Sequence, residues 1–161
     1  MEAILHSLDK FFAKNDIKYC VTGTVALRLL GAPSSHTPQD LDVRVYELTP
    51  EQRQVLEDLQ GLNSPLSSNY ESTCYKFLVH GFPVNAICVD KPQMPNESIP
   101  VVIRNYGESR IINVHSFRGA LEEKMKLNRP KDNKYLLDLI KNMTHENKYS
   151  TKSKNPYEGH C

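Results

Sequence analysis

Two aspartates separated by one residue, Asp40 and Asp42, are the side chains in this sequence whose type and spacing best suit chemistry. They stand at the head of an apolar run, Leu41–Glu47, that is typical of a strand. Alternate side chains of a strand share a face, so we expect both carboxylates to point the same way while Leu41 and Val43 enter a core. Two adjacent carboxylates repel each other unless a cation or a shared proton lies between them. Hard oxygen ligands suit Mg²⁺ or Mn²⁺, so the pair predicts a divalent metal site.

A glycine and a threonine upstream indicate what such a metal would accompany. Gly23 and Thr24 follow a predicted strand, Ile17–Thr22, and open a predicted helix, Thr24–Leu30, which we expect to end at Gly31. The start of a helix offers unpaired backbone N–H groups to a phosphate, and glycine lets the backbone approach a ligand closely. A phosphate cradle joined by one short loop to a carboxylate pair predicts a site for a metal-bound nucleoside triphosphate.

These residues resemble a known family. The run Gly23-Thr24-x-Ala26-Leu27, then Gly31, then Asp40-Leu41-Asp42-Val43 is similar to the DNA polymerase β-like nucleotidyltransferase superfamily. Within it, the small bacterial branch of minimal nucleotidyltransferases and AbiEii-type toxins is the most similar. A second block is similar to the C-terminal helices of that branch: Glu123-Lys124-Met125, Leu127-Asn128-Arg129-Pro130-Lys131-Asp132 and Leu136-Leu137-Asp138-Leu139.

The resemblance implies a metal-dependent transfer of a nucleoside monophosphate from a nucleoside triphosphate to an acceptor hydroxyl. Asp40 and Asp42 would then bind the metal, and Gly23 and Thr24 would bind the phosphates. Basic residues of the second block would neutralise phosphate charge: Lys124, or Lys126 in its place, with Arg129 and Lys131. For Lys124, an ordinary surface lysine is the alternative interpretation. The resemblance leaves the acceptor open among RNA, a protein and a small molecule, and a toxin–antitoxin setting would add a protein partner.

One carboxylate that the resemblance leads us to expect is replaced. The strand-like segment Phe82–Val89 carries Asn85 at that position, and Asp90 is no substitute because it is five residues further along a strand. An asparagine can lend a carbonyl oxygen to a metal, but it cannot act as a general base. We still include Asn85 with Asp40 and Asp42 as the candidate catalytic group. The alternative function is a catalytically inactive nucleotidyltransferase fold that binds a nucleotide or a protein; a third is an unrelated α/β domain with a coincidental Asp-x-Asp.

The loop before the aspartates has the sequence Ser34-Ser35-His36 where the resemblance leads us to expect an arginine. His36 would be either a phosphate contact or a solvent-exposed residue, and we favour the second.

Composition limits the remaining classes of function. The chain has 161 residues, enough for one domain. No apolar run approaches the roughly 18–20 residues of a membrane span, and Met1–Lys14 lacks a signal-peptide pattern. We therefore expect a cytoplasmic protein without a membrane partner. Four cysteines without C-x-x-C spacing favour buried free thiols over a zinc site: Cys20, Cys74, Cys88 and Cys161.

Charge is unevenly distributed. Residues 1–100 hold 8 Lys and Arg against 12 Asp and Glu, and residues 101–161 hold 12 against 7. A basic C-terminal half suits a triphosphate or an RNA backbone, and equally suits a solvated helix surface.

The hydrophobic pattern predicts an α/β (α+β) fold, a small mixed sheet flanked by helices with a C-terminal helix pair. Thr49 and Gln52 have the spacing of a capping box, and Ser116 suits a helix N-cap. The predicted helices are Glu2–Lys14, Pro50 to about Leu59, Phe117 to about Leu127 and Pro130 to about Met143. The predicted strands beyond those above are Ser72–Val79, Phe82–Val89, Val101–Arg104 and Arg110–Val114. The predicted loops include Gly61–Tyr70 and Lys91–Ser98.

Two further expectations concern the C-terminal helices. We expect Leu121 and Met125 on the inner face of the first, and four apolar residues buried in the second: Leu136, Leu137, Leu139 and Ile140. Residues 1–145 would form the nucleotidyltransferase-like domain, and the polar residues 146–161 a flexible tail.

Overall fold

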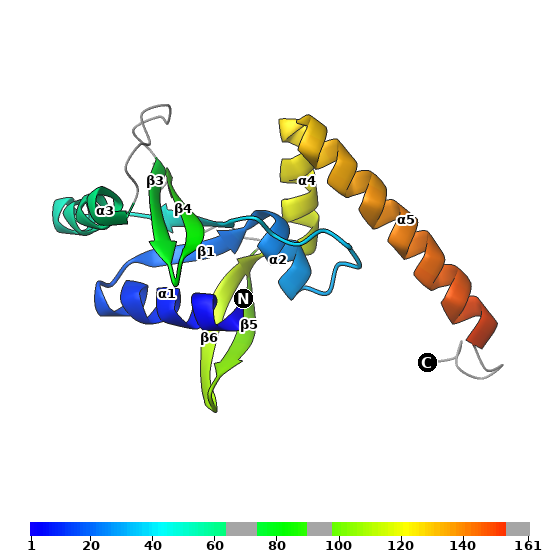
Figure 1. Cartoon of the computed structure of the whole chain (residues 1–161), viewed down its shortest axis with the longest axis horizontal. Coiled ribbons are helices and arrows are strands. Elements are labelled where there is room, and N and C mark those ends of the chain that lie inside the picture. The colour runs from blue at the N-terminus through cyan, green and yellow to red at the C-terminus, as the bar shows by residue number, and fades with distance from the viewer. Residues whose placement is uncertain (64–73, 90–97, 154–161) are drawn as a thin grey trace.

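The computed structural model describes residues 1–63, 74–89 and 98–153 of the chain (Figure 1). Its elements are, in order, α1 (Glu2–Lys14), β1 (Lys18–Thr22), α2 (Gly23–Leu29), β2 (Leu41–Tyr46), α3 (Pro50–Asn63), β3 (Cys74–Val79), β4 (Phe82–Val89), β5 (Ser98–Asn105), β6 (Glu108–His115), α4 (Phe117–Leu127) and α5 (Pro130–Ser153). The predicted α/β class, with a mixed sheet, flanking helices and a C-terminal helix pair, is confirmed.

The strands form one mixed sheet in the order β3-β4-β2-β1-β6-β5. Central strand β2 runs parallel to β4 and antiparallel to β1, and β1 runs parallel to β6. The register aligns Thr22, Asp42 and Asn85 across β1, β2 and β4. Aligned residues of neighbouring strands lie on the same face of a sheet, so the pairing itself gathers these three side chains in one row.

The opposite face of the same strands forms the core. Leu41 and Val43, which alternate with the aspartates, are fully buried, as the strand pattern predicted. They belong to one hydrophobic cluster with Leu5, Leu8 and Phe12 from α1, which packs along the sheet. A central strand with one apolar face and one polar face therefore places its carboxylates opposite the core.

The capping interactions predicted at two helix starts are confirmed. The backbone N–H of Gln52 donates to Thr49 Oγ1 at 3.2 Å, and Gln52 Oε1 accepts from the backbone N–H of Thr49 at 2.8 Å. Ser116 Oγ accepts from the backbone N–H of Gly119 at 3.0 Å at the start of α4. Both caps satisfy backbone donors that a helix start leaves unpaired.

Several predicted boundaries were too short. Helix α3 continues to Asn63, so residues 61–63, predicted as loop, are helical. Strand β5 already begins at Ser98, and α5 continues to Ser153, well beyond Met143. The polar composition after residue 143 lacks an apolar stripe, which is why hydrophobic periodicity missed the helix there.

The predicted inner faces of the C-terminal helices were partly wrong. Met125, Leu137 and Ile140 are 63%, 69% and 59% exposed. Leu139 is buried as predicted, and Leu121 and Leu136 are half-buried against the core.

Among the described side chains of α5, Asp132 and Tyr135 are buried together with Leu139, at helical spacing. Asp132 occupies this buried face because it is paired with basic side chains, and counting apolar residues could not predict that pairing.

Some predictions fall outside the described residues: the loop positions 64–70 and 91–97, the strand start at 72–73, Asp90, Cys161 and the last part of the predicted tail. The division of the chain into residues 1–145 and a tail remains a prediction. Cys20, Cys74 and Cys88 are free cysteines. Across the described residues, no helix combines the length and the apolar character that crossing a membrane requires.

Candidate functional site

The two aspartates and Asn85 meet at one point. The side-chain amide of Asn85 donates from Nδ2 to Asp40 Oδ2 at 3.1 Å and to Asp42 Oδ1 at 2.8 Å. Asp40 lies just before β2, and its side chain reaches the same side as Asp42, as strand alternation predicted. Two carboxylate oxygens within hydrogen-bond distance of one nitrogen necessarily converge, and their mutual repulsion is offset by the amide donor.

Burial and the neighbouring charge make the ionised form of Asp42 less favourable. Burial raises the pKa of Asp42, the hydrogen bond from Asn85 opposes the rise, and the nearby charge of Asp40 adds to it. A half-buried pair of converging carboxylates is typical of a site that receives a cation.

The glycine at the start of α2 lies directly against this pair. Gly23 has φ +69°, and a Cβ built on it would stand 3.3 Å from Asp42 Oδ2. Glycine therefore serves two needs here: it adopts a left-handed backbone conformation, and it leaves room for the carboxylate. Thr24 follows it, and its Oγ1 accepts a hydrogen bond from Lys124 Nζ at 2.8 Å. The structure thus brings together Gly23, Thr24 and the aspartates, residues that are about 20 positions apart in the sequence.

Lys124 is an interior residue, and the surface interpretation was wrong. Its side chain is 9% exposed, and Nζ lies 3.7 Å from Asp132 Oδ1 and 4.5 Å from the ring centroid of Tyr135. Burial lowers the pKa of Lys124, which Asp132 opposes. The lysine therefore links α4 to α2 and α5 while it lines the cavity described below.

The two other predicted phosphate-binding residues differ from each other. Arg129 makes two hydrogen bonds to Asp132, from Nε to Oδ2 at 2.6 Å and from Nη2 to Oδ1 at 3.0 Å, so its guanidinium is largely engaged within the protein. Lys131 is exposed, and its charge acts on Asp42 by lowering that carboxyl's pKa. The ammonium group of Lys131 is therefore more available to a ligand than the guanidinium of Arg129.

A cavity of about 690 Å³ unites these groups. Its lining comes from the sheet, the start of α2 and the α4–α5 junction: Thr22, Gly23, Asp40, Asp42, Arg44, Cys74, Lys76, Asn85, Ile87, Glu123, Lys124, Lys126, Leu127, Arg129 and Lys131. Ligand pockets commonly measure 300–1,000 Å³. Six of the lining residues are basic and three are acidic, so the cavity suits an anionic ligand that brings a metal with it.

Sequence reasoning missed one ion pair on the cavity wall. Arg44 Nη2 donates to Glu123 Oε2, which also lies 3.8 Å from His115 Nδ1. Arg44 lies two residues beyond Asp42, so strand alternation could have identified it as facing the same side. Its partner on α4 could not be found in that way, because 79 residues separate the two.

The carboxylates fit a divalent metal by their donor chemistry. Two converging carboxylate oxygens, completed by phosphate oxygens and water, are a usual ligand set for Mg²⁺. A half-turn of the Asn85 amide would present its Oδ1 in place of Nδ2, which adds a neutral oxygen ligand. In the described part of the chain, no cluster of three or more His, Cys, Asp or Glu residues surrounds a common point, so the acid pair has no third charged ligand.

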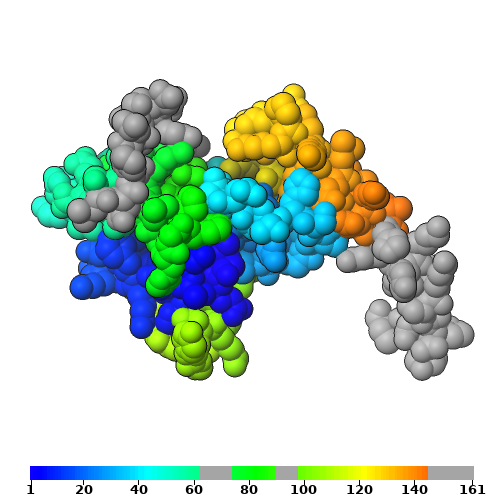
Figure 2. All heavy atoms as spheres, in the orientation of Figure 1, coloured from blue at the N-terminus to red at the C-terminus, as the bar shows by residue number. Residues whose placement is uncertain are grey.

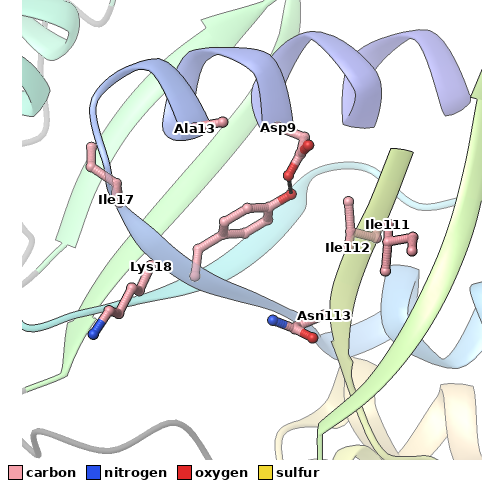
Figure 3. A pocket seen from close by; sticks show the side chains of 8 residues that line it. Asp9, Ala13, Ile17, Lys18, Ile111, Ile112 and Asn113 are labelled. Atoms are coloured by element: carbon pink, nitrogen blue, oxygen red, sulfur yellow. Dashed lines mark hydrogen bonds between the residues drawn. The ribbon is translucent and has the colours of Figure 1, made fainter. Parts of the chain in front are cut away.

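A second cavity, of about 320 Å³, lies between α1, β1 and β6 (Figure 3). Its main polar group is Asp9, and both oxygens of that carboxylate are engaged: Oδ1 accepts from Tyr19 Oη at 2.6 Å and Oδ2 from Arg110 Nε at 2.6 Å. This cavity therefore lacks the converging, incompletely neutralised groups of the first.

His36 is not the solvent-exposed residue that we favoured, and a phosphate contact from it stays a prediction. It is half-buried, and its ring meets the ring of Tyr135 edge-on at 5.5 Å. The preferred interpretation, a solvent-exposed residue, was wrong because α5 lies over this segment, which the local sequence does not reveal.

No protein-family model matches the sequence, and no curated protein matches it. Solved structures do resemble the fold. One is a candidate nucleotidyltransferase from Thermotoga maritima, with TM-score 0.53 and 18% identity over 85% of this chain and 92% of that one. Another is an antigenic nucleotidyltransferase-like protein from Paracoccidioides brasiliensis, with TM-score 0.54 and 16% identity over 86% of this chain and 73% of that one.

A third similar structure is ANT(2")-Ia in complex with adenylyl-2"-tobramycin, with TM-score 0.50 and 12% identity over 82% of each chain. At such identities the likeness concerns the fold. The chain therefore has a nucleotidyltransferase-like fold, in agreement with the superfamily that its motifs resemble.

Proposed function

We propose that this nucleotidyltransferase-like chain transfers a nucleoside monophosphate from a metal-bound nucleoside triphosphate to an acceptor hydroxyl. The observation that carries the proposal is the meeting of Asp40 Oδ2 and Asp42 Oδ1 at the Asn85 amide. This acid pair lies in a cavity whose lining also holds six basic residues, and Gly23 lies against Asp42. The fold that the chain shares with nucleotidyltransferases supports this chemistry, and the residues of the site carry the assignment.

The roles that we assign follow from the positions of the residues. Asp40 and Asp42 would hold Mg²⁺ or Mn²⁺, which when bound would supply positive charge to stabilise the charge that develops during transfer. Backbone groups at Gly23 and Thr24 would orient the phosphates beside the acids. Lys124, whose ammonium group already donates to Thr24 Oγ1, would add fixed positive charge behind them.

The exposed basic rim of the cavity would neutralise the rest of the triphosphate. Lys126 and Lys131 are both exposed and both line the cavity. Arg129 would contribute mainly by its charge, because Asp132 holds its guanidinium. The six basic residues of the lining also make an anionic acceptor, RNA included, easier to accommodate than a polycation.

Within the superfamily, we propose the small bacterial branch of minimal nucleotidyltransferases and AbiEii-type toxins, on the strength of the C-terminal block. The buried Lys124–Asp132 contact supports this, because it gives two residues of that block a common structural role.

A second candidate function is nucleotide binding without transfer, and the observation that favours it is Asn85. An amide cannot accept the acceptor's proton, and the acid pair has no third carboxylate among the described residues. The cavity and its charges would then serve recognition alone.

Label transfer separates the two candidates. The full chain is incubated with α-³²P-labelled NTPs, Mg²⁺ or Mn²⁺ and cell extract, beside the double variant Asp40→Ala/Asp42→Ala. Transfer by the native chain, lost in the double variant, supports the enzyme. Calorimetric nucleotide binding without any label transfer supports the binding protein.

The matched control removes two neighbouring carboxylates far from the cavity. Glu57→Ala/Asp58→Ala changes the net charge by the same amount on the exposed surface of α3. This variant should transfer label like the native chain. Equal loss in both double variants would mean that bulk charge, and not the metal pair, supports the activity.

A further inference from the structure

Asp40 and Asp42 are held in different ways. Asp42 lies within β2 and is fixed by the ladders to β1 and β4. Asp40 precedes the strand and ends the segment 30–40, which has no helix or strand of its own. Its carboxylate therefore depends on the path of that segment as well as on the hydrogen bond from Asn85. Whatever anchors the segment decides where Asp40 lies relative to Asp42.

Asp138 of α5 holds the middle of this segment. Its Oδ2 accepts from Ser34 Oγ at 3.0 Å and from the backbone N–H of Ser35 at 2.9 Å, and its Oδ1 accepts from Ser35 Oγ at 2.8 Å. A fourth donor, Asn142 Nδ2 at 3.3 Å, belongs to the same helix. In Figure 2 the light-blue segment before β2 lies directly against the orange helix α5. The three donors of the segment converge on one carboxylate more than 100 residues away.

Asp138 is ionised, and further contacts of the segment with itself and with α5 support its hydrogen bonds. The hydrogen bonds from Ser35 and Ser34 hold the pKa of Asp138 below its usual value, so the carboxylate stays ionised and its hydrogen bonds are charge-assisted. Ser34 Oγ also accepts from the backbone N–H of His36 at 3.1 Å. One turn earlier on α5, Tyr135 packs against the His36 ring. Positions three apart on a helix lie on one face, so α5 grips the segment with two neighbouring side chains.

We infer that Asp138 is a positioning residue: through Ser34 and Ser35 it fixes the segment that carries Asp40, and so sets the spacing of the two carboxylates of the cavity. The position of the Asp40 carboxylate relative to the Asn85 amide, the geometric part, does not depend on a metal. Its consequence for metal binding rests on the proposed function. The two parts are tested by separate measurements.

The geometric part is tested by NMR on the full chain without metal. The reporter is the side-chain NH₂ of Asn85, assigned by its loss in Asn85→Asp, because it donates to both aspartates. In Asp138→Ala we expect these resonances to shift. We also expect the backbone amides of Ser35 and His36, whose hydrogen bonds depend on this anchor, to exchange about tenfold faster, which corresponds to about 1.4 kcal/mol of lost protection.

Two control variants show whether the NMR changes come from the contact between Asp138 and the segment. Asn142→Ala removes the one donor to Asp138 that lies outside the segment, and it should leave the Asn85 signals and the exchange rates unchanged. Asp138→Asn keeps one acceptor oxygen and should restore part of the native spectrum. Unchanged Asn85 signals in folded Asp138→Ala would overturn the inference. If that variant does not fold, Ser35→Ala, which deletes one hydroxyl donor, should give the same shift in a smaller size, and its absence would be equally decisive.

The metal part is tested by titrating Mn²⁺ against the chain and a non-hydrolysable ATP analogue, followed by electron paramagnetic resonance. Asp138→Ala should bind Mn²⁺ about tenfold more weakly, the usual effect of losing a residue that orients a ligand. Because Asp138 acts through Asp40, Asp40→Ala/Asp138→Ala should bind no more weakly than Asp40→Ala alone. Effects that multiply would show that Asp138 acts by another route and would overturn the inference. If the native chain binds no Mn²⁺ at all, the proposed function fails, and the NMR result still decides the position of Asp40.

Discussion

A Cβ atom at Gly23 would lie 3.3 Å from Asp42 Oδ2, so any side chain at the start of α2 would crowd the carboxylate of β2 and require it to shift slightly. Gly23 also has a positive φ of +69°. Two independent constraints therefore meet at this residue, one of the backbone and one of the site.

The variant Gly23→Ala should lose stability and function together. A left-handed backbone costs a non-glycine residue about 1–2 kcal/mol, and the added methyl group also displaces Asp42. We expect a lower melting temperature and weaker binding of the Mn²⁺–nucleotide complex, measured by calorimetry. The matched control is Gly107→Ala in the turn between β5 and β6, because Gly107 has φ +81° and nothing within 4 Å of the added Cβ. This control should lose similar stability with unchanged nucleotide binding; an equal loss of binding would contradict the close approach at Gly23.

Asn85→Asp should make the stability of the chain strongly dependent on metal. The change removes the donor that offsets the repulsion of Asp40 and Asp42 and adds a third negative charge beside them. Without metal the melting temperature should fall, and with Mn²⁺ it should recover by more than the native chain gains, since a ligand that binds only the folded state stabilises it.

Differential scanning fluorimetry with and without Mn²⁺ measures both effects. Asn85→Ala is the control, because it removes the same donor without adding charge, and it should show no larger gain with Mn²⁺ than the native chain. Identical responses of the two variants would mean that Asn85 does not face a metal position.

Lys124 and Lys126, two residues apart on α4, should fail in different ways. Lys124→Met breaks the contacts to Thr24 and Asp132 in the interior, at an expected cost of about 1–3 kcal/mol in the free energy of unfolding. Lys126→Met changes an exposed residue of the cavity rim, so stability should be unchanged while nucleotide affinity falls. Urea unfolding and calorimetry separate the two results. A stable Lys124→Met chain would show that the interior contacts contribute little.

Asp42→Asn should stabilise the free protein at neutral pH. Burial raises the pKa of Asp42 in the folded state above its ordinary value of 3.8, so the folded state holds this proton more tightly than the unfolded state. The resulting stability is present at low pH and is lost as the pH rises through the folded-state pKa. An asparagine carries no charge to bury, so the variant should melt higher than the native chain at pH 7.

This advantage should shrink as the pH falls towards 3.8, where the native carboxyl is protonated as well. Each kcal/mol in the free energy of unfolding changes the melting temperature by about 2–4 °C for a chain of this size. Melting curves between pH 4 and pH 8 measure the trend. Asp58→Asn, on the exposed surface of α3, controls for the loss of one negative charge. Equal melting temperatures of Asp42→Asn and the native chain at pH 7 would contradict the cost of burying this carboxylate.

Local pattern was sufficient for part of this protein. Strand alternation correctly put Asp40 and Asp42 on one side and Leu41 and Val43 on the other, because the side-chain period of a strand is a property of the backbone. The caps at Thr49 and Ser116 were predictable for the same reason: a helix start needs nearby side-chain acceptors. Each of these features joins residues that are close in the sequence.

Only the tertiary structure decided the rest. The sheet order sets Asn85 beside Asp42, the packing of α4 buries Lys124, and the docking of α5 brings Asp138 onto the segment before Asp40. These contacts join residues between 43 and 103 positions apart. The buried charge of Lys124 is tolerated because Asp132 of α5 pairs with it, and the identity of such a partner depends on how the elements pack. The sequence by itself therefore determined which groups could bind a metal and a phosphate, whereas packing decided which of them are free to do so.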